Sequence, residues 1–424
     1  MNFEVSALSN GTRVVCVPMK ERRSVATGIW VHVGGRDEEP RLNGVSHFLE
    51  HIVFKGTGRR TANQIKESVE GIGGSLNAFT SEECTCFLAK AASRHFAEVF
   101  DVLADMVVDA SMTPADVEKE RTVIMEEIKM TQDQPSHFVE EILSEILWPG
   151  HPLGRPLTGT LETVGGLTRD DLCGYRDAFY NPALLTVVAA GDIDAARLTA
   201  AAEKSFGRAK ARTVKKPDPF RAGAAAAPAV RVFRKSTEQT HLALGMHTFP
   251  KEHPDEFALD LLSVILGGNM SSRLFNEVRE ERGLAYDIGS SVRKYHETGA
   301  FVVSAGVDTK KLGEAIKVIR AELLRITREP VEAGELKRAR EFYLGQLDLG
   351  LENSMNAMLW AGDNMVSLGR CRTPQEVTGL VEKVTPDDVR RVAAKLFAGG
   401  AGELAVVGPV PEGAEKTLTG VLSA

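Results

Sequence analysis

Apolar residues recur along the chain with two different spacings. The spacing of a helix with one buried face predicts helices at residues 44–54, 61–71, 93–109, 114–131 and 193–205. The runs VATGIWVHVG (25–34) and ECTCFLAKA (83–91) predict strands, and SNGT (9–12) between alternating runs predicts a hairpin turn. This mixture predicts an α+β fold in which helices pack against a mostly antiparallel sheet.

The same pattern occurs twice. LTRDDLCGYRDAFYNPALLTVVAAGDI (167–193) resembles VTPDDVRRVAAKLFAGGAGELAVVGPV (384–410), and each predicts a Thr-capped helix, a turn and an apolar strand. Residues 102–128 resemble residues 318–347 in the same way. Because the two matches are offset by a similar amount, we interpret the chain as two duplicated halves.

A segment rich in Ala, Pro and basic residues separates these halves. Residues 207–231 have no helical or strand periodicity long enough to build a core, so they predict a linker. We therefore predict an N-terminal domain at 1–208, a linker at 209–229 and a C-terminal domain at 230–424. A chain of 424 residues is long enough for two cores.

Composition and charge narrow the classes of partner. The net charge of −7 gives no support for nucleic acid or an anionic membrane as a partner. No apolar run approaches the roughly 20 residues that cross a bilayer, and the N-terminus lacks the pattern of a secretory signal. Five scattered cysteines fit a reducing compartment, and we expect Cys84 and Cys86 to pack in a core. The predicted location is the cytoplasm.

The candidate chemistry of the first half is concentrated in SHFLEH (46–51). His47 and His51 stand four residues apart on a predicted helix, so both imidazoles project from one face and can reach one metal ion. Zinc accepts imidazole nitrogens and lowers the pKa of a bound water to about 7. Glu50, on a neighbouring line of that face, can accept a proton from this water. For the motif alone, a pair of exposed histidines on an amphipathic helix remains the alternative.

A third ligand can come from EKERTVIMEEI (118–128). Glu120 and Glu127 stand seven residues apart, which is two turns along one helical face, with Ile124 and Ile128 as apolar neighbours. Carboxylates on a packed helix need a partner, and a divalent cation would supply one. Taken alone, however, this segment also fits a solvated acidic face.

The order His-x-x-Glu-His inverts His-Glu-x-x-His and is the motif of the inverzincins. The chain resembles the insulinase/pitrilysin family, in the branch similar to the mitochondrial processing peptidase and its bacterial relatives. The resemblance covers most of the chain, including GGSLNAFTS (73–81), HPLGRPLTGT (151–160) and MSSRLFNEVREERGLAY (270–286). In that family a glutamate about 76 residues beyond the second histidine completes the zinc shell, and that position here is Glu127. An auxiliary glutamate seven residues earlier falls on Glu120.

The resemblance implies that His47, His51 and Glu127 bind one Zn²⁺ per chain and that Glu50 is the general base. Glu120 would support catalysis by orienting or polarising the site. Glu126 does not fit the ligand position, because it faces about 100° away from Glu127 on the helix.

The resemblance also implies how substrate is held. In the family, an extended peptide pairs with the edge of the strand at SLNAFTS (75–81), so that backbone rather than side chains is recognised. Asn77, Ala78 and Phe79 are the substrate-binding positions carried over. Turn chemistry and core packing remain the alternatives for Asn77 and Phe79.

The second half lacks the metal ligands, because the repeat places the apolar ALDLLSVIL (258–266) opposite the metal-binding helix. The resemblance implies that this half faces the first as a clam shell and contributes Arg279 and Tyr286 to substrate binding. An arginine could anchor a carbonyl, and a tyrosine hydroxyl could stabilise an oxyanion. Arg282 is the competing choice for the arginine.

These expectations predict a zinc-dependent endopeptidase that hydrolyses peptides or extended, unfolded protein segments in an enclosed chamber. Because one chain carries both the metal motif and the Arg/Tyr pair, we expect a self-sufficient subunit that forms a homodimer. One alternative is a targeting-sequence processing protease that needs a homologous partner subunit. Another is a non-catalytic scaffold subunit, although such subunits usually lose part of the metal motif and this chain has kept all of it.

Overall fold

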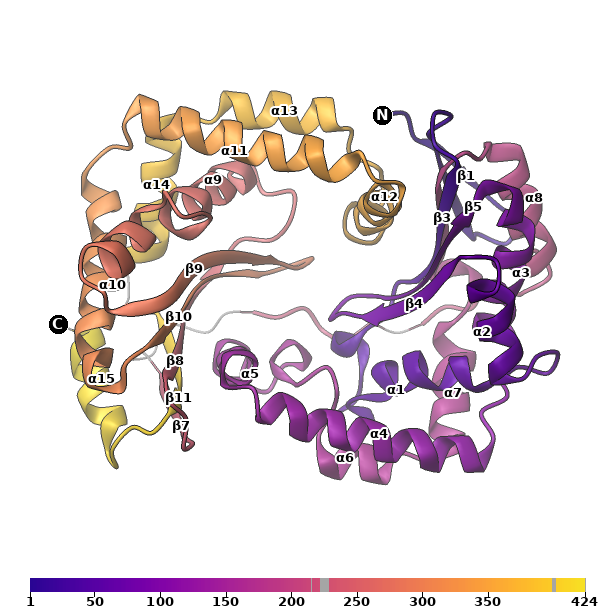
Figure 1. Cartoon of the computed structure of the whole chain (residues 1–424), viewed down its shortest axis with the longest axis horizontal. Helices are drawn as coiled ribbons and strands as arrows, with labels where there is room; N and C mark the ends of the chain where they lie inside the picture. The colour runs from indigo at the N-terminus through magenta and orange to yellow at the C-terminus, as the bar shows by residue number, and fades with distance from the viewer. Residues whose placement is uncertain (215, 222–228, 399–401, 424) are drawn as a thin grey trace. The chain divides into compact units, whose positions relative to one another are not determined.

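A computed structural model describes residues 1–214, 216–221, 229–398 and 402–423. The chain forms two compact units, each built around one sheet (Figure 1). The first unit comprises Met1–Lys129, Arg155–Asp218 and Asp348–Pro374, and the second comprises Met130–Gly154, Pro219–Leu347 and Gln375–Ala424. The chain therefore passes between the units inside the predicted linker (209–229), and also at four other points. Residues 215 and 222–228 of that linker lie outside the described part.

A six-stranded sheet forms the centre of the first unit. Its strands, in spatial order, are β1 (Glu4–Ala7), β2 (Arg13–Pro18), β6 (Leu185–Gly191), β3 (Ser24–Val31), β5 (Thr85–Ala92) and β4 (Ser75–Thr80). All neighbours are antiparallel except β2 and β6. The predicted turn at residues 9–12 joins β1 to β2, where Gly11 takes a positive φ of 96°. The mostly antiparallel sheet of the α+β prediction is thus confirmed.

Helices cover both faces of this sheet. The helices of the first unit are α1 (Val45–Ile52), α2 (Ala62–Glu70), α3 (Phe96–Asp109), α4 (Pro114–Gln132), α6 (Leu161–Gly166), α7 (Arg169–Phe179), α8 (Ala195–Phe206) and α12 (Ser354–Leu368). Side chains alternate between the faces, so Val14 and Cys16 pack in the core under α1, α3 and α8. Val15 and Val17 point to the opposite core, together with the buried Cys84 and Cys86.

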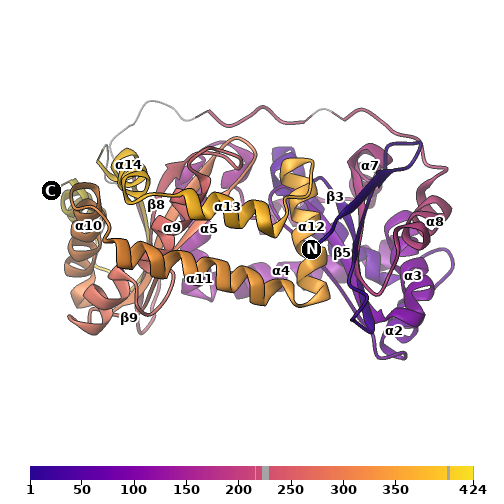
Figure 2. The same ribbon diagram turned by 90° about the horizontal axis from the view of Figure 1, so that it is seen from above.

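The opposite face of the first sheet is covered by a helix from the second half of the sequence. Helix α12 packs against β3 and β6 through Ala357, Met358 and Ala361. Figures 1 and 2 both show α12 beside β3. The approach is close at Gly362, where an added Cβ would lie 2.0 Å from the indole ring of Trp30. Glycine is therefore required for this helix to reach the sheet.

The second unit repeats the arrangement with five strands. They are, in spatial order, β7 (Val230–Arg234), β11 (Glu403–Gly408), β8 (Thr240–Thr248), β10 (Gly299–Val307) and β9 (Ala285–Lys294). As with β2 and β6, the outer pair β7 and β11 is parallel and the other neighbours are antiparallel. The predicted duplication is thus visible in the strand order.

The second unit also contains a helix from the other half of the sequence. The helices of this unit are α5 (Pro135–Leu147), α9 (Glu256–Gly267), α10 (Leu312–Arg328), α11 (Ala333–Leu351), α13 (Pro374–Lys383), α14 (Pro386–Phe397) and α15 (Ala414–Ser423), with a π-helical turn at Phe275–Glu280. Helix α5, from the first half of the sequence, packs against β8 and β11 (Figure 1). Each half of the sequence therefore gives one helix to the sheet of the other. Within the described residues, no helix is both long and apolar enough to cross a membrane.

Candidate metal centre

Helix α1 carries the HFLEH motif, and a buried carboxylate holds its first turn. The residue before the helix is Gly44, whose φ of 93° is left-handed and which has no side chain to cap the helix. Glu38 accepts hydrogen bonds there from the backbone N–H groups of Gly44 (2.7 Å) and Ser46 (2.9 Å) and from the Asn43 amide (3.1 Å). Burial raises the pKa of Glu38 to about 7, although these hydrogen bonds oppose the rise.

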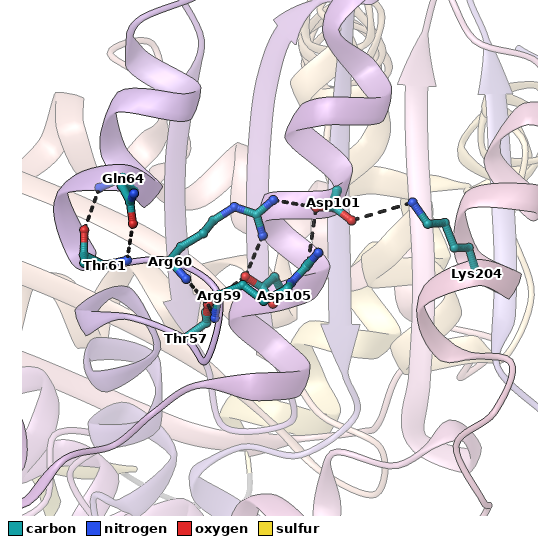
Figure 3. Close-up of polar contacts among 8 residues, drawn as sticks. All are labelled: Thr57, Arg59, Arg60, Thr61, Gln64, Asp101, Asp105 and Lys204. Carbon is teal, nitrogen blue, oxygen red and sulfur yellow. Dashed lines mark hydrogen bonds and ion pairs between the residues drawn. The ribbon is translucent and has the colours of Figure 1, made fainter.

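A second buried carboxylate holds the segment that follows α1. Asp105 on α3 accepts hydrogen bonds from Thr57 Oγ1 (2.7 Å), Arg59 Nε (2.8 Å) and Arg60 Nη1 (2.6 Å), as Figure 3 shows. Burial acts to raise the pKa of Asp105, but the hydrogen bonds from these three residues outweigh it and lower the pKa. Glu38 therefore holds the start of α1, and Asp105 holds the loop that follows the 3₁₀ turn after it.

The structure brings together the three predicted metal ligands. His47 and His51 project from α1 and Glu127 from α4, and one nitrogen or oxygen atom of each lies within 4.8 Å of the others. Glu127 Oε2 is 3.8 Å from His47 Nε2 and 3.4 Å from His51 Nε2. Ligand atoms around a tetrahedral zinc ion are separated by about 3.3 Å. The two histidines and the carboxylate are therefore compatible with a bound zinc ion, and among the described residues they are the one such cluster.

The electrostatics of the three side chains differ. Burial, followed by the charge of His51, lowers the pKa of His47 to about 4, so its imidazole is neutral at pH 7. Burial also acts to lower the pKa of His51, but the hydrogen bond and charge of Glu127 raise it overall. The hydrogen bond from His51 lowers the pKa of Glu127, which keeps that carboxylate ionised. A neutral imidazole and an ionised carboxylate are the forms that bind a metal ion.

Glu50 lies in the same helix and is held from the neighbouring strand. Thr80 Oγ1, at the end of β4, donates a hydrogen bond of 2.7 Å to Glu50 Oε2. Burial raises the pKa of Glu50, while the hydrogen bonds from Thr80 and the charge of His51 oppose the rise. A carboxylate with a raised pKa is suited to accepting and returning a proton near neutral pH.

Glu120 lies on the other side of His51. This residue is only 2% exposed, and its Oε2 is 3.4 Å from His51 Nδ1, the nitrogen that does not face Glu127. Its Oε1 is 2.7 Å from the Lys55 ammonium. A carboxylate in this place can fix the tautomer and the orientation of a metal-binding histidine. Glu126, by contrast, is exposed and pairs with Lys129 at 2.7 Å.

The three residues predicted to contact substrate on β4 differ in their surroundings. Strand β4 is the last strand of the sheet, so one of its edges is not paired within it. Asn77 is exposed and its side-chain oxygen accepts a hydrogen bond from the Ala78 N–H at 2.9 Å. The Phe79 ring packs edge-on against Trp30, with 5.5 Å between the ring centroids. Phe79 thus takes part in the core beneath the strand, as its alternative interpretation supposed.

Arg279 and Tyr286 lie together in the second unit. The Arg279 guanidinium is 5.3 Å from the centroid of the Tyr286 ring and 4.8 Å from that of Phe275. Tyr286 is 73% exposed at the start of β9, so its ring is accessible. Arg282, the competing choice, is instead held by Glu277, which receives a hydrogen bond of 2.6 Å from Arg282 Nη1. This geometry favours Arg279 as the partner of Tyr286.

Three residues of the site were not predicted: Glu38, Lys55 and Thr80. Lys55 could have been found from helical spacing, since it follows His51 by four residues and α1 continues into a 3₁₀ turn at Val53–Lys55. Thr80 lies within the SLNAFTS segment, but nothing in the sequence pairs it with Glu50. Glu38 caps a helix from outside it, so no capping motif marks it.

Two family models together match most of the chain. Residues 13–161 match the model described as Insulinase (Peptidase family M16), and residues 166–343 match the model described as Peptidase M16 inactive domain. An "uncharacterized zinc protease" of Streptomyces coelicolor is 36% identical over 412 residues, which are 96% of this chain and 90% of that protein. The chain belongs to the insulinase family, peptidase family M16. The predicted resemblance is thus confirmed.

A second relative and two solved structures are also similar to the chain. The "uncharacterized zinc protease YmxG" of Bacillus subtilis is 36% identical over 392 residues, 92% of this chain and 94% of YmxG. Among solved structures, a protease from Helicobacter pylori has a TM-score of 0.90 at 23% identity, covering 96% of this chain and 99% of that one. A peptidase M16 inactive domain from Pseudomonas fluorescens has a TM-score of 0.88 at 16% identity, covering 97% and 98%. These two similarities show that the M16 fold is shared.

Proposed function

We propose that this M16 chain is a zinc-dependent endopeptidase whose ligands are His47, His51 and Glu127. The observation that carries the proposal is the cluster of these three side chains with Glu50 one residue before His51. Zinc in this cluster would act as a Lewis acid and make water in the site more acidic. We expect one zinc ion per chain.

The residues of the chain account for the remaining steps of peptide hydrolysis. Glu50 takes the proton of the attacking water and returns it to the leaving amine nitrogen, which its raised pKa favours. Glu120 orients His51 through Nδ1. Arg279 and Tyr286 are proposed to bind the substrate carbonyl and the oxyanion that develops from it.

The free edge of β4 supports an extended peptide as substrate. Main-chain pairing along Asn77, Ala78 and Phe79 would hold a peptide by its backbone, so we expect broad sequence specificity. An enclosed chamber is part of the proposal and would exclude folded proteins. A protein should then be cleaved after unfolding but not in its native form, which gel analysis of one substrate in both states would test.

We propose that the chain acts in the cytoplasm without a partner of different sequence, as a homodimer. The basis is that one chain carries the metal cluster, Arg279 and Tyr286. Light scattering should give twice the chain mass of 46.0 kDa. Cleavage that appears only after a homologous subunit is added would favour the processing protease instead.

One experiment tests the central claim. Bound zinc and cleavage of a quenched peptide library are measured for the wild type, Glu50→Gln and Glu127→Gln. We expect Glu50→Gln to retain zinc while cleavage falls by at least about 10²-fold, because only the proton acceptor is lost. We expect Glu127→Gln to bind zinc more weakly, because a charged ligand is lost.

Glu126→Gln is the matched control. Glu126 is adjacent in sequence, exposed and paired with Lys129, so this variant should keep both zinc and cleavage. A wild type without stoichiometric zinc, or cleavage by Glu50→Gln at the wild-type rate, would contradict the proposed function.

A further inference from the structure

The contact between Thr80 and Glu50 links the edge strand to the proposed general base. Thr80 is the last residue of β4, and its Oγ1 donates to Glu50 Oε2 at 2.7 Å. Leu76 and Ala78 pack against the core that contains α1, and Thr80 continues their alternation, so its hydroxyl points toward that helix. The strand thereby presents a hydrogen-bond donor to the one carboxylate of α1.

A hydroxyl in this position does two things to a carboxylate. It holds one oxygen, which restricts the side chain to one orientation and leaves the other oxygen available to a proton. It also stabilises the ionised form, which is the form that accepts a proton.

We propose that Thr80 is a positioning residue for the hydrolytic reaction, which orients Glu50 through the hydrogen bond from its hydroxyl. The inference rests on the proposed peptidase function and extends it to the strand that we expect to bind substrate. Since Thr80 ends β4 directly after Phe79, the bond couples the position of the base to that of the strand edge.

The second unit contains a contact at the same place in the fold, and it supplies the competing explanation. Thr80 pairs with Thr85, the first residue of β5, and Lys294 pairs with Gly299, the first residue of β10. Lys294 Nζ lies 2.7 Å from Asp260 on α9. Among the described residues, α9 contributes to no metal cluster, so this contact joins a helix to the last strand of its sheet without a metal cluster on that helix. The competing explanation is that the hydrogen bond from Thr80 serves only to hold α1 against the sheet.

Three variants separate the two explanations. Thr80→Val removes the hydroxyl and keeps the volume and the preference for a strand. Thr80→Ser keeps the hydroxyl, and Thr122→Val removes a hydroxyl from an exposed site on α4, where it donates a hydrogen bond to the Glu118 carbonyl. The kcat and KM for a quenched peptide, the zinc affinity by chelator competition and the Tm are measured for each variant and for the wild type.

We expect Thr80→Val to lower kcat by about tenfold, with KM and zinc affinity within about twofold of the wild type. Thr80→Ser should recover most of the loss, and Thr122→Val should match the wild type. A wild-type kcat in Thr80→Val would overturn the inference and leave the peptidase proposal intact. If Tm and zinc affinity fall together with kcat, Thr80 holds α1 against the sheet rather than orienting Glu50, and this result would also overturn the inference. If the wild type itself cleaves nothing, the proposed function fails, and this inference fails with it.

Discussion

The carboxylate of Glu120 lies between an imidazole and an ammonium, those of His51 and Lys55. A buried carboxylate is unfavourable unless charged or polar groups compensate for the loss of water. Lys55 does so on one side, which leaves the other oxygen directed at His51 Nδ1. Glu120 and Lys55 are therefore placed to act on His51, the proposed metal ligand, without belonging to the three-residue cluster.

Glu120→Gln should lower the zinc affinity by about tenfold, because outer partners of metal-binding histidines typically contribute 10- to 100-fold. The amide keeps the volume but loses the charge that attracts both His51 and the cation. Competition with a chelator of known affinity measures the effect. Glu118→Gln, on an exposed carboxylate of the same helix, is the control and should bind zinc normally. Equal affinities for both variants would contradict the outer-partner role.

The His-x-x-Glu-His motif predicted which side chains could lie close together, but not which other residues hold them in place. The i, i+4 spacing of His47 and His51 is a local property of a helix, so the sequence alone contained it. The distance of Glu127 from His51 along the chain had meaning only through the family resemblance. The hydrogen bond of Thr80 with Glu50 joins residues 30 positions apart, and that of Glu38 with Ser46 joins residues 8 positions apart. Such contacts depend on the folded strand and loop.

Local patterns of apolar and polar residues predicted the helices and strands whose packing partners are near in sequence. The predicted helices at 61–71 and 114–131 correspond to α2 (Ala62–Glu70) and α4 (Pro114–Gln132). The sequence did not predict which sheet α5 and α12 pack against, because an apolar helical face does not specify the sheet that it covers. Shape at the contact, such as Gly362 beneath Trp30, supplies that information and appears only in three dimensions.

Gly362→Ala should destabilise the first unit by about 1–3 kcal/mol, since its Cβ would overlap the Trp30 indole in a packed core. The free energy of unfolding in urea measures this loss. Gly345→Ala is the control, because a Cβ on that glycine of α11 meets nothing within 4 Å. It should be neutral or stabilise by up to about 1 kcal/mol, as alanine favours helix. An unchanged midpoint for Gly362→Ala would show that α12 is not closely packed there.

The pH dependence of stability is a property of the whole molecule to which buried carboxyls contribute with opposite signs. Glu38 has a pKa of about 7 in the fold and 4.5 as the ordinary value, so the folded state binds its proton more tightly. Its stabilising effect is present below pH 4.5 and is lost as pH rises through about 7. Asp105 has a lowered pKa, so its contribution is present above its ordinary value of 3.8 and is lost in acid.

Glu38→Gln should therefore flatten the fall in stability between pH 5 and pH 8. The Glu38 contribution over this range is about 3 kcal/mol, from about 1.4 kcal/mol per unit of pKa. Thermal unfolding of both proteins, with a chelator present to remove metal effects, gives the difference between the two profiles. Groups that do not interact with Glu38 contribute equally to both profiles and cancel in that difference. Parallel profiles would show that Glu38 does not titrate in this range.

The exchange of α5 and α12 has a consequence for the order of synthesis. Strand β6 completes the first sheet at Gly191, but the helix that covers one of its faces begins at Ser354. At ribosomal rates of about 5–20 residues per second, that apolar face remains uncovered for roughly ten to thirty seconds before α12 is synthesised. Helix α5 meets the reverse situation, because it leaves the ribosome before any strand of its sheet exists. A nascent chain of this protein therefore has exposed apolar surface during most of its translation, and chaperones that bind such surface would have time to reach it.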